Sequence, residues 1–290
     1  MRLVTFAPGG AAPRLGALSD GAVVDISTAL APVATDMIGL LRVGARGLEL
    51  ARRALASPVP TTRHDLATLT LLAPVPRPGK ILGIGRNYGA HAAEGGLAAQ
   101  ENPRIFVKLT SAVIGNGAPI PKPAAVTKLD YETELAVVIG RRARGVRESE
   151  ALAYVGGYTI LNDVSARELQ FDVSPPQTSF AKSMDGFCPM GPCLATPDEL
   201  ADPGDIRLRG WVNGELVQDG NTHDLIFPIP RLIAYLASFL TLEPGDVIAT
   251  GTPAGVGAFR KPPRYLAPGD VVRMEIEGIG VLENRVTAAD

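Results

Sequence analysis

Short apolar segments bounded by glycine and proline constrain the fold of this chain more than any other feature. With 32 glycines and 25 prolines in 290 residues, turns are frequent throughout. The segments are short and rich in β-branched residues, which is typical of strands. They do not alternate regularly with helical patterns, so a β-rich α+β fold is favoured over a βαβ order. The predicted strands are 80–85, 105–109, 132–140, 155–164, 206–216, 246–251 and 270–286.

The beginning of the chain has a different pattern from the rest. Residues 1–26 alternate between apolar and polar side chains with Gly-rich turns, which predicts a small β-meander. Residues 35–56 have apolar positions at helical spacing and predict one helix. Several prolines follow between residues 58 and 78. We therefore expect a small N-terminal α+β domain at 1–75 and a larger catalytic domain at 76–290.

Two local signals place further elements in the larger domain. Residues 228–240 begin with proline and continue with apolar residues at helical spacing, so they predict an amphipathic helix. The dipeptide Asn213-Gly214 lies between two strand-like runs, where it favours a tight hairpin turn.

Charge and cysteine content exclude several classes of protein. The formal net charge is −2, and no basic block suggests a nucleic-acid partner. The sequence has no apolar run of membrane-spanning length and no leader pattern, so we expect a cytoplasmic protein without a membrane partner. Cys188 and Cys193 are too few for a disulfide framework or a zinc ribbon and are expected to be free thiols. His64, His91 and His223 are too far apart in sequence to support a histidine-based zinc site.

Carboxylates are concentrated where two buried strands begin or end. Glu132 and Glu134 alternate along one strand, so they point the same way, about 7 Å apart. Asp163 ends the next apolar run. Such carboxylates repel one another unless a cation lies between them, although a solvent-facing acidic edge strand would show the same pattern. An all-oxygen set favours Mg²⁺, Mn²⁺ or Ca²⁺ over zinc. Asp130 lies on the same face but is interpreted as supporting or surface-exposed.

A histidine and a glutamate at helical spacing form a candidate catalytic pair. His91 and Glu94 are separated by three residues, so on a helix they share a face. A carboxylate that holds an imidazole raises its basicity, which suits a general base. An exposed polar helix is the ordinary alternative for such a bare pair. The polar, Gly-rich residues 95–103 that follow are consistent with a mobile lid.

Other polar residues remain ambiguous from pattern alone. Lys182 precedes an apolar stretch and is either a surface residue or a buried cation. Arg167 and Gln170 share a face with Asp163 if the chain turns helical after that aspartate. The Gly-rich stretches 83–89 and 251–257 match neither a dinucleotide-binding fingerprint nor a P-loop.

Seven stretches in fixed order give the chain a family resemblance. It resembles the fumarylacetoacetate hydrolase family, and in particular bacterial acylpyruvase-like members. The resemblance implies a mixed β-sandwich or roll with a small N-terminal domain, and a homodimer. The matching stretches are GIGRNYGAHAAE (83–94), FVKLTSAVIGNGAPI (106–120), DYETELAVVIG (130–140), YTILNDVSARELQ (158–170), AKSMDGFCPMGP (181–192), VNGELVQDGNTHDLIF (212–227) and LEPGDVIATGTPAGVG (242–257).

The resemblance assigns roles to ten residues. It implies that three carboxylates bind Mg²⁺ or Mn²⁺, with Ca²⁺ as a further candidate ion, and that a His–Glu pair activates water. It also implies a lysine that stabilises enolate charge, and it gives His223 no role. The metal ligands are Glu132, Glu134 and Asp163; the catalytic residues are His91, Glu94 and Lys182; the substrate-binding residues are Arg86, Arg167, Gln170 and Thr252.

These roles predict a metal-dependent hydrolase of the C–C bond in a β-diketo acid, of the acylpyruvate or fumarylpyruvate type found in aromatic catabolism. The same scaffold would also suit decarboxylation of oxaloacetate or a similar 2-oxo acid, and isomerisation or hydration of a dienoate. A catalytically silent 2-oxo acid binder and an enzyme for a larger specialised diketide are two further hypotheses. Residues 171–182 depart from the usual family pattern, so they are expected to reshape the pocket.

Overall fold

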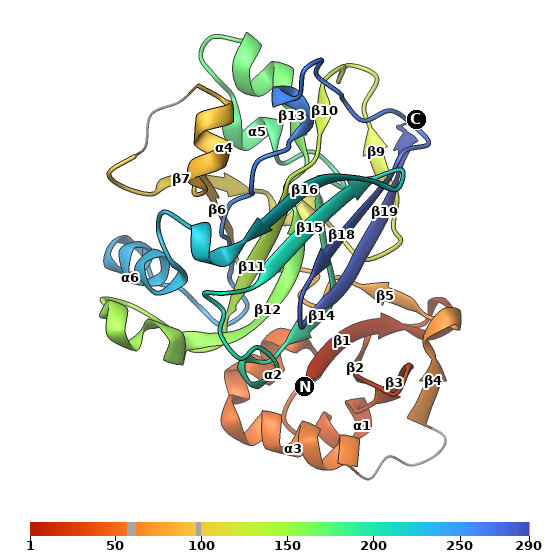
Figure 1. The fold of residues 1–290 in the computed structure, drawn as a ribbon. Coiled ribbons are helices and arrows are strands. Elements are labelled where there is room, and N and C mark those ends of the chain that lie inside the picture. Colours follow the sequence, from red (N-terminus) through yellow and green to blue (C-terminus); the bar gives the residue numbers. More distant parts are fainter. Residues whose placement is uncertain (57–61, 97–99, 290) are drawn as a thin grey trace.

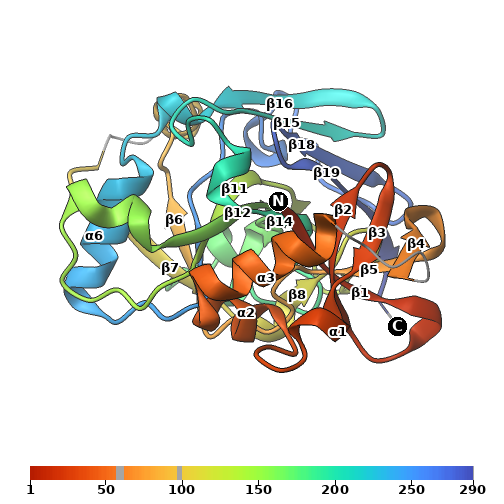
Figure 2. The same ribbon diagram turned by 90° about the horizontal axis from the view of Figure 1, so that it is seen from below.

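The computed structural model describes residues 1–56, 62–96 and 100–289, and within them the chain forms a mixed β-sandwich. A twelve-stranded sheet and a five-stranded sheet pack face to face, and a two-stranded sheet lies beside them (Figure 1). Helices cover the edges and one outer face (Figures 1 and 2). This arrangement confirms the predicted β-rich α+β fold. No helix of the described residues is long and apolar enough to cross a lipid bilayer.

The strands at the centre of the large sheet are fully buried. Every residue of β11 (Thr133–Ile139) and β12 (Val155–Asn162) is buried, which explains their nearly continuous apolar sequences. Along β11, Leu135 and Val137 belong to one apolar cluster and Ala136 and Val138 to another, so the strand separates two cores. The order is β4-β3-β2-β1-β14-β12-β11-β17-β6-β7, with β5 paired to β1 and β8 to β14. The remaining bounds are β4 (Arg63–Asp65), β5 (Thr70–Leu72), β6 (Ile81–Gly85), β7 (Arg104–Lys108), β8 (Val113–Ile114), β14 (Cys188–Ala195) and β17 (Val247–Ala249).

The N-terminal meander is present and continues the large sheet. Strand β1 (Arg2–Ala7) pairs with β2 (Arg14–Ser19) on one side and with β14 on the other. Strand β3 (Ala22–Asp25) completes the meander. The sheet therefore runs across residue 75, and the division into two domains there stays a prediction.

The single helix predicted over 35–56 is wrong in one respect, because the segment forms two helices. Helix α2 (Met37–Val43) and helix α3 (Ala45–Ala56) are separated at Gly44. Gly44 has φ 66°, a left-handed conformation that favours glycine and ends a helix. The short helix α1 (Ser27–Leu30) precedes them.

The structure confirms both local signals predicted for residues 76–290. Asn213 and Gly214 have φ 51° and 83°, as a two-residue hairpin with positive φ at both positions requires. Helix α6 (Ile229–Phe239) begins directly after Pro228, within the predicted range. The order of the five-stranded sheet is β16-β15-β18-β19-β9, with bounds β9 (Ile120–Lys122), β15 (Arg207–Val212), β16 (Glu215–Asn221), β18 (Val271–Ile276) and β19 (Gly280–Ala288).

Candidate active site

Three carboxylates meet where β11 begins and β12 ends. Glu132 immediately precedes β11, Glu134 lies in it, and Asp163 follows β12. The antiparallel register holds the two segments together, because the Asp163 amide donates a hydrogen bond of 3.0 Å to the Glu132 carbonyl. One oxygen from each of the three carboxylates lies within 4.8 Å of the others, and all three residues are buried. The sequence-predicted ligand set is therefore one compact cluster.

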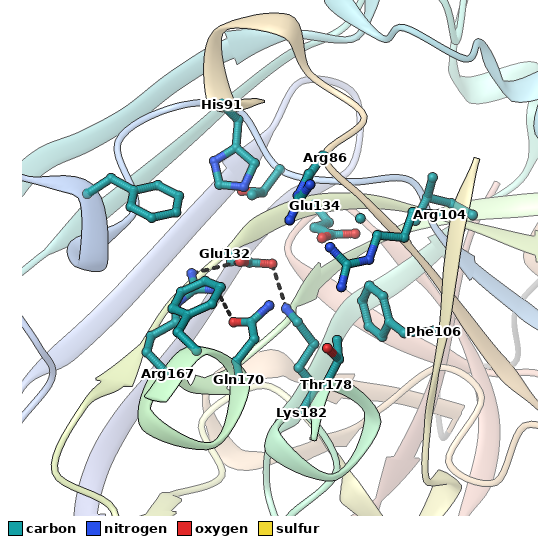
Figure 3. Close-up of a pocket in the computed structure, with 15 residues that line it drawn as sticks. Arg86, His91, Arg104, Phe106, Glu132, Glu134, Arg167, Gln170, Thr178 and Lys182 are labelled. Atoms are coloured by element: carbon teal, nitrogen blue, oxygen red, sulfur yellow. Dashed lines mark hydrogen bonds and ion pairs between the residues drawn. The ribbon is translucent and has the colours of Figure 1, made fainter. Parts of the chain in front are cut away.

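Basic side chains neutralise two of these carboxylates. The Glu132 carboxylate is 2.9 Å from Lys182 Nζ and 2.7 Å from Arg167 Nη2 (Figure 3). The Asp163 carboxylate is 2.5 Å from Lys182 Nζ and 2.6 Å from Lys108 Nζ. Both lysines are almost completely buried, so these pairs lie in a region of low dielectric where unpaired charges are costly.

The third carboxylate, Glu134, has no basic partner in the described part of the chain. Its Oε2 accepts a hydrogen bond of 2.8 Å from the Gly251 amide. Burial raises the pKa of Glu134 well above its usual range, and Asp163 and Glu132 raise it further. Burial also favours the neutral form of Glu132, but Lys182, Arg167 and His91 together lower the pKa of that carboxyl. Without a bound cation Glu134 therefore favours its neutral form, and its charged form would have no basic partner among the described residues.

The donor set fits a hard divalent cation. Carboxylate oxygens are preferred ligands of Mg²⁺, Mn²⁺ and Ca²⁺, and Glu134 supplies a charge for such an ion to balance. Burial disfavours the charged form of Lys182, but Asp163 and Glu132 more than offset this effect and raise its pKa. Lys182 is therefore a buried cation, and the surface interpretation does not apply.

Asp130 supports the site from behind. It is completely buried, and its Oδ2 accepts a hydrogen bond of 2.8 Å from Arg167 Nε. Its oxygens also accept from the amides of Gly257 at 2.8 Å and Ala258 at 2.9 Å. Asp130 therefore fixes both Arg167 and the loop after β17, and it is not a surface residue.

The His91–Glu94 pair forms as predicted, and each of the two side chains also contacts a residue outside the helix. Both residues lie in helix α4 (Gly89–Glu94), and His91 Nδ1 is 2.8 Å from Glu94 Oε1. Glu94 Oε2 accepts a hydrogen bond of 2.9 Å from the Gly255 amide. The imidazole of His91 is buried 5.7 Å from the Phe259 ring. Since Nδ1 is occupied, Nε2 is the nitrogen left for substrate (Figure 3).

The predicted lid lies only partly within the described residues. Gly95 and Gly96 follow α4 as a turn, and residues 97–99 are outside the described ranges. The lid stays a prediction.

The chain does not turn helical directly after Asp163. Strand β13 (Ser165–Ala166) comes first and pairs with β10 (Leu129–Asp130), and a π-helical turn then spans Glu168–Asp172. The three residues therefore do not share one helix face as the spacing alone would allow. Arg167 and Gln170 still meet, because Arg167 Nη1 donates to Gln170 Oε1 at 2.8 Å.

A pocket opens above these groups. Figure 3 shows side chains from separate segments of the chain converging on it. Asp163 and Glu94 lie behind its wall, where they hold other site residues. The predicted residues that line it are Arg86, His91, Glu132, Glu134, Arg167, Gln170, Lys182 and Thr252.

Several site residues were missed by the sequence analysis. Lys108 is completely buried, binds Asp163, and donates to the Lys182 carbonyl. A lysine inside an apolar strand was the available signal for it. Gln218 of β16 donates to Thr252 Oγ1 at 2.7 Å, but a glutamine in a hairpin strand carries no such signal. The pocket is also lined by Ile84, Gly85, Arg104, Phe106, Phe171, Thr178 and Phe259.

Residues 171–182 contribute to the pocket, as their unusual sequence suggested. Phe171 lies over the Arg167 guanidinium, 5.8 Å from its centre, and stacks at 6.1 Å on Phe259. Helix α5 (Thr178–Ala181) places Thr178 and then Lys182 against the cavity.

The cysteines and His223 have no part in this site. Cys188 and Cys193 are free and buried, which confirms the prediction, and burial raises the pKa of each thiol to about 12. His223 is exposed and lies near Asp205 and Asp224, so its interpretation as a surface residue holds.

Comparison with known proteins identifies the family. The family described as fumarylacetoacetate (FAA) hydrolase C-terminal matches residues 80–287. The chain belongs to the fumarylacetoacetate hydrolase family. It is 43% identical over 289 residues to the mitochondrial oxaloacetate tautomerase FAHD2B of Bos taurus, covering 99% of this chain and 91% of that protein.

Two solved structures extend this result to the fold. Fumarylacetoacetate hydrolase from Exiguobacterium antarcticum is 37% identical with a TM-score of 0.86, covering 99% of both chains. Maleylpyruvate hydrolase from Sphingobium sp. SYK-6, in complex with manganese (II) ion and pyruvate, is 34% identical with a TM-score of 0.82, covering 100% of both chains. The protein is therefore an enzyme of this family, and the family contains more than one reaction.

Proposed function

We propose that this protein is a metal-dependent enzyme that forms the enolate of a 2-oxo acid, with oxaloacetate tautomerisation as its leading reaction. The observation that carries the proposal is the position of His91, which is held by Glu94 and faces the same pocket as Glu132 and Glu134. A positioned base beside a cation-binding cluster is what proton removal next to a carbonyl requires. The name of the 43% identical relative favours oxaloacetate as the substrate.

In this proposal the residues around the pocket divide the work of proton transfer. His91 Nε2 removes a proton from C3, and the C3–H electron pair forms the C2–C3 double bond. The carbonyl electron pair moves to the 2-oxygen, which then takes a proton from water, and His91 returns its own proton to water. Lys182, buried beside the acids, stabilises the transient negative charge on the 2-oxygen.

Glu132, Glu134 and Asp163 would hold the divalent ion. When bound, the ion supplies Lewis-acid polarisation of the 2-oxo acid and lowers the barrier to proton loss at C3. Arg167, fixed by Asp130 and Gln170, would orient the substrate carboxylate, and Thr252 would donate a further hydrogen bond. Arg86 would contribute from the opposite side of the pocket.

Hydrolysis of a C–C bond in an acylpyruvate is the second candidate function. It is favoured by the likeness to maleylpyruvate hydrolase and uses the same base. His91 would remove a proton from water, and the water oxygen would attack the distal acyl carbonyl. The bond between the acyl carbon and C3 would break, its electron pair would leave as the enolate of pyruvate, and His91 would return the proton to C3.

One set of assays separates these reactions. Chelator-treated protein, with and without Mn²⁺ or Mg²⁺, is given oxaloacetate and, separately, acetylpyruvate, while enol absorbance and pyruvate are both followed. Metal-dependent equilibration of the oxaloacetate enol without pyruvate supports tautomerisation. Pyruvate and acetate from acetylpyruvate support hydrolysis, and pyruvate from oxaloacetate supports decarboxylation. No reaction with either substrate, with metal bound, would contradict the proposal and favour a silent binder.

The homodimer and the cytoplasmic location stay proposals. Val107 of edge strand β7, Leu109 directly after that strand and Phe180 of helix α5 expose apolar side chains, which a second copy of the chain would cover. Sedimentation of the wild-type protein and of Val107→Lys tests this: a dimer that becomes monomeric supports it, and a wild-type monomer contradicts it.

A further inference from the structure

Two arginines at the mouth of the pocket have no ion-pair partner among the described residues. Arg86 and Arg104 both line the pocket, and Figure 3 shows their guanidinium groups turned toward the space above the carboxylates. Within residues 1–56, 62–96 and 100–289, neither guanidinium has a hydrogen-bond or ion-pair partner. Every other basic side chain that lines this pocket, His91 included, contacts a carboxylate.

The register of the sheet brings the two arginines together. In the antiparallel pairing of β6 with β7, Arg104 lies opposite Gly85, the residue before Arg86. Arg86 itself has φ 60°, an uncommon conformation for a residue with a side chain. Burial lowers the pKa of the Arg86 guanidinium, and the nearby Arg104 lowers it further. Two like charges are thus held side by side, which costs free energy unless an anion lies between them.

Strand β7 connects this pair to the carboxylate cluster. Side chains two residues apart on a strand share a face, so Arg104, Phe106 and Lys108 point the same way. Lys108 contacts Asp163, and the Phe106 ring lies 4.9 Å from Lys182 Nζ. Arg104 is therefore about 13 Å along the strand from Lys108, at the outer end of the same face.

We infer that Arg86 and Arg104 together bind a second carboxylate of the substrate, so that the enzyme prefers 2-oxo acids with two negative charges. One carboxylate would lie at Arg167 with the 2-oxo group, and the other would lie between the two mouth arginines. The planar guanidinium forks suit this role, because they bind a carboxylate through paired hydrogen bonds. This inference rests on the proposed function and specifies its substrate class.

Binding of unreactive 2-oxo acids to the Mn²⁺-loaded protein tests the inference by calorimetry. 2-Oxobutyrate carries one carboxylate, and 2-oxoglutarate carries the same 2-oxo acid end with a second carboxylate. In Arg104→Gln, affinity for 2-oxoglutarate is expected to fall about 10- to 100-fold, as for the loss of a charged hydrogen bond. Affinity for 2-oxobutyrate should change by less than about twofold, because the Arg104 side chain is exposed and lies away from the position proposed for the 2-oxo acid end of the ligand.

Arg46→Gln is the matched control, because Arg46 is exposed on α3 and its loss changes the net charge equally. The control should bind both ligands like the wild type. Equal loss of both ligands in Arg104→Gln, or loss of neither, would overturn the inference and leave the proposed function standing. Failure of the wild type to bind either ligand would instead overturn the proposed function and this inference with it.

Discussion

The basic side chains at the floor and at the mouth of the pocket differ in whether a carboxylate pairs with them. The floor consists of the carboxylate cluster and the basic residues beside it. These basic residues are Lys108, Arg167 and Lys182, and each is buried and paired with at least one carboxylate. The mouth consists of Arg86 and Arg104, which line the same cavity but have no carboxylate partner among the described residues. Basic side chains therefore serve two purposes within a single pocket.

The difference separates charges that are already paired within the fold from charges whose pairing is left to a ligand. A buried charge is tolerated only when the fold supplies an oppositely charged partner. At the floor, Glu134 is the carboxylate without such a partner among the described residues. A partly exposed guanidinium is solvated and keeps its bonding capacity for substrate. We therefore expect changes at the floor to affect folding and catalysis together, and changes at the mouth to affect substrate choice alone.

The largest effect is expected from removing the base between these regions. His91→Ala should lower the turnover of oxaloacetate or acetylpyruvate by about 1,000-fold, because positioned general bases contribute on this scale. Mn²⁺ affinity, measured by calorimetry, should stay within about threefold, since His91 is not among the clustered carboxylates. An unchanged turnover rate would remove His91 from the mechanism.

The same substitution at two neighbouring glutamates, Glu132 and Glu134, should change the unfolding free energy differently. Glu132→Gln leaves Lys182 and Arg167 each short of a buried partner, so the metal-free protein should lose about 3 kcal/mol of unfolding free energy. Glu134→Gln removes the carboxylate that lacks a basic partner and should not lower the unfolding free energy of the metal-free protein. Urea unfolding in the presence of chelator measures both.

Equal destabilisation by the two substitutions would contradict the conclusion that Glu132 has basic partners and Glu134 has none among the described residues. Glu49→Gln, at an exposed position on α3, serves as the control for loss of a surface carboxylate. It should change the unfolding free energy by less than about 0.5 kcal/mol.

A smaller effect is expected from the residue that positions the base. Glu94→Gln keeps a hydrogen-bond acceptor for the Gly255 amide but loses the charge beside His91. Turnover should fall by about 10-fold, in line with supporting residues of other sites. Mn²⁺ affinity should stay within about threefold, because Glu94 is not among the clustered carboxylates. An unchanged turnover rate in Glu94→Gln would contradict the positioning role.

The smallest effect is expected at the two cysteines. Cys188 and Cys193 are buried with thiol pKa values raised to about 12, so thiolate is scarce at a pH of about 8. Iodoacetamide should leave the native protein unlabelled and should label both residues in urea, as measured by intact mass. Rapid labelling of the native protein at either cysteine would contradict the buried placement.

The sequence predicted most of the long strands because their signals are local, but it missed β14 and joined β18 and β19 into one strand. Segments such as 132–140 and 155–164 are buried on both faces, so their apolar runs are nearly continuous. The helix over 35–56 was predicted as one piece because its apolar spacing continues through Gly44, whereas the left-handed backbone there divides it.

The residues predicted for the site do lie together in the structure. The contacts that support them could not be predicted from the sequence. Glu132, Glu134 and Asp163 were found from alternation and strand ends, which a sequence displays. Lys108 and Gln218 reach the site through pairing between distant segments, and such pairing leaves no periodic mark. Arg104 lies at the first position of β7, and only the register with β6 places it beside Arg86.

Titration of Mn²⁺ into chelator-treated protein tests the assignment of the carboxylate cluster as a metal site. The wild type should bind one ion per chain, and Glu134→Gln should bind it at least about 100-fold more weakly, since ligand loss costs at least as much as loss of a supporting partner. Circular dichroism should show that this variant remains folded. Equal Mn²⁺ binding by the folded variant and the wild type would contradict the assignment of the carboxylate cluster as the metal site.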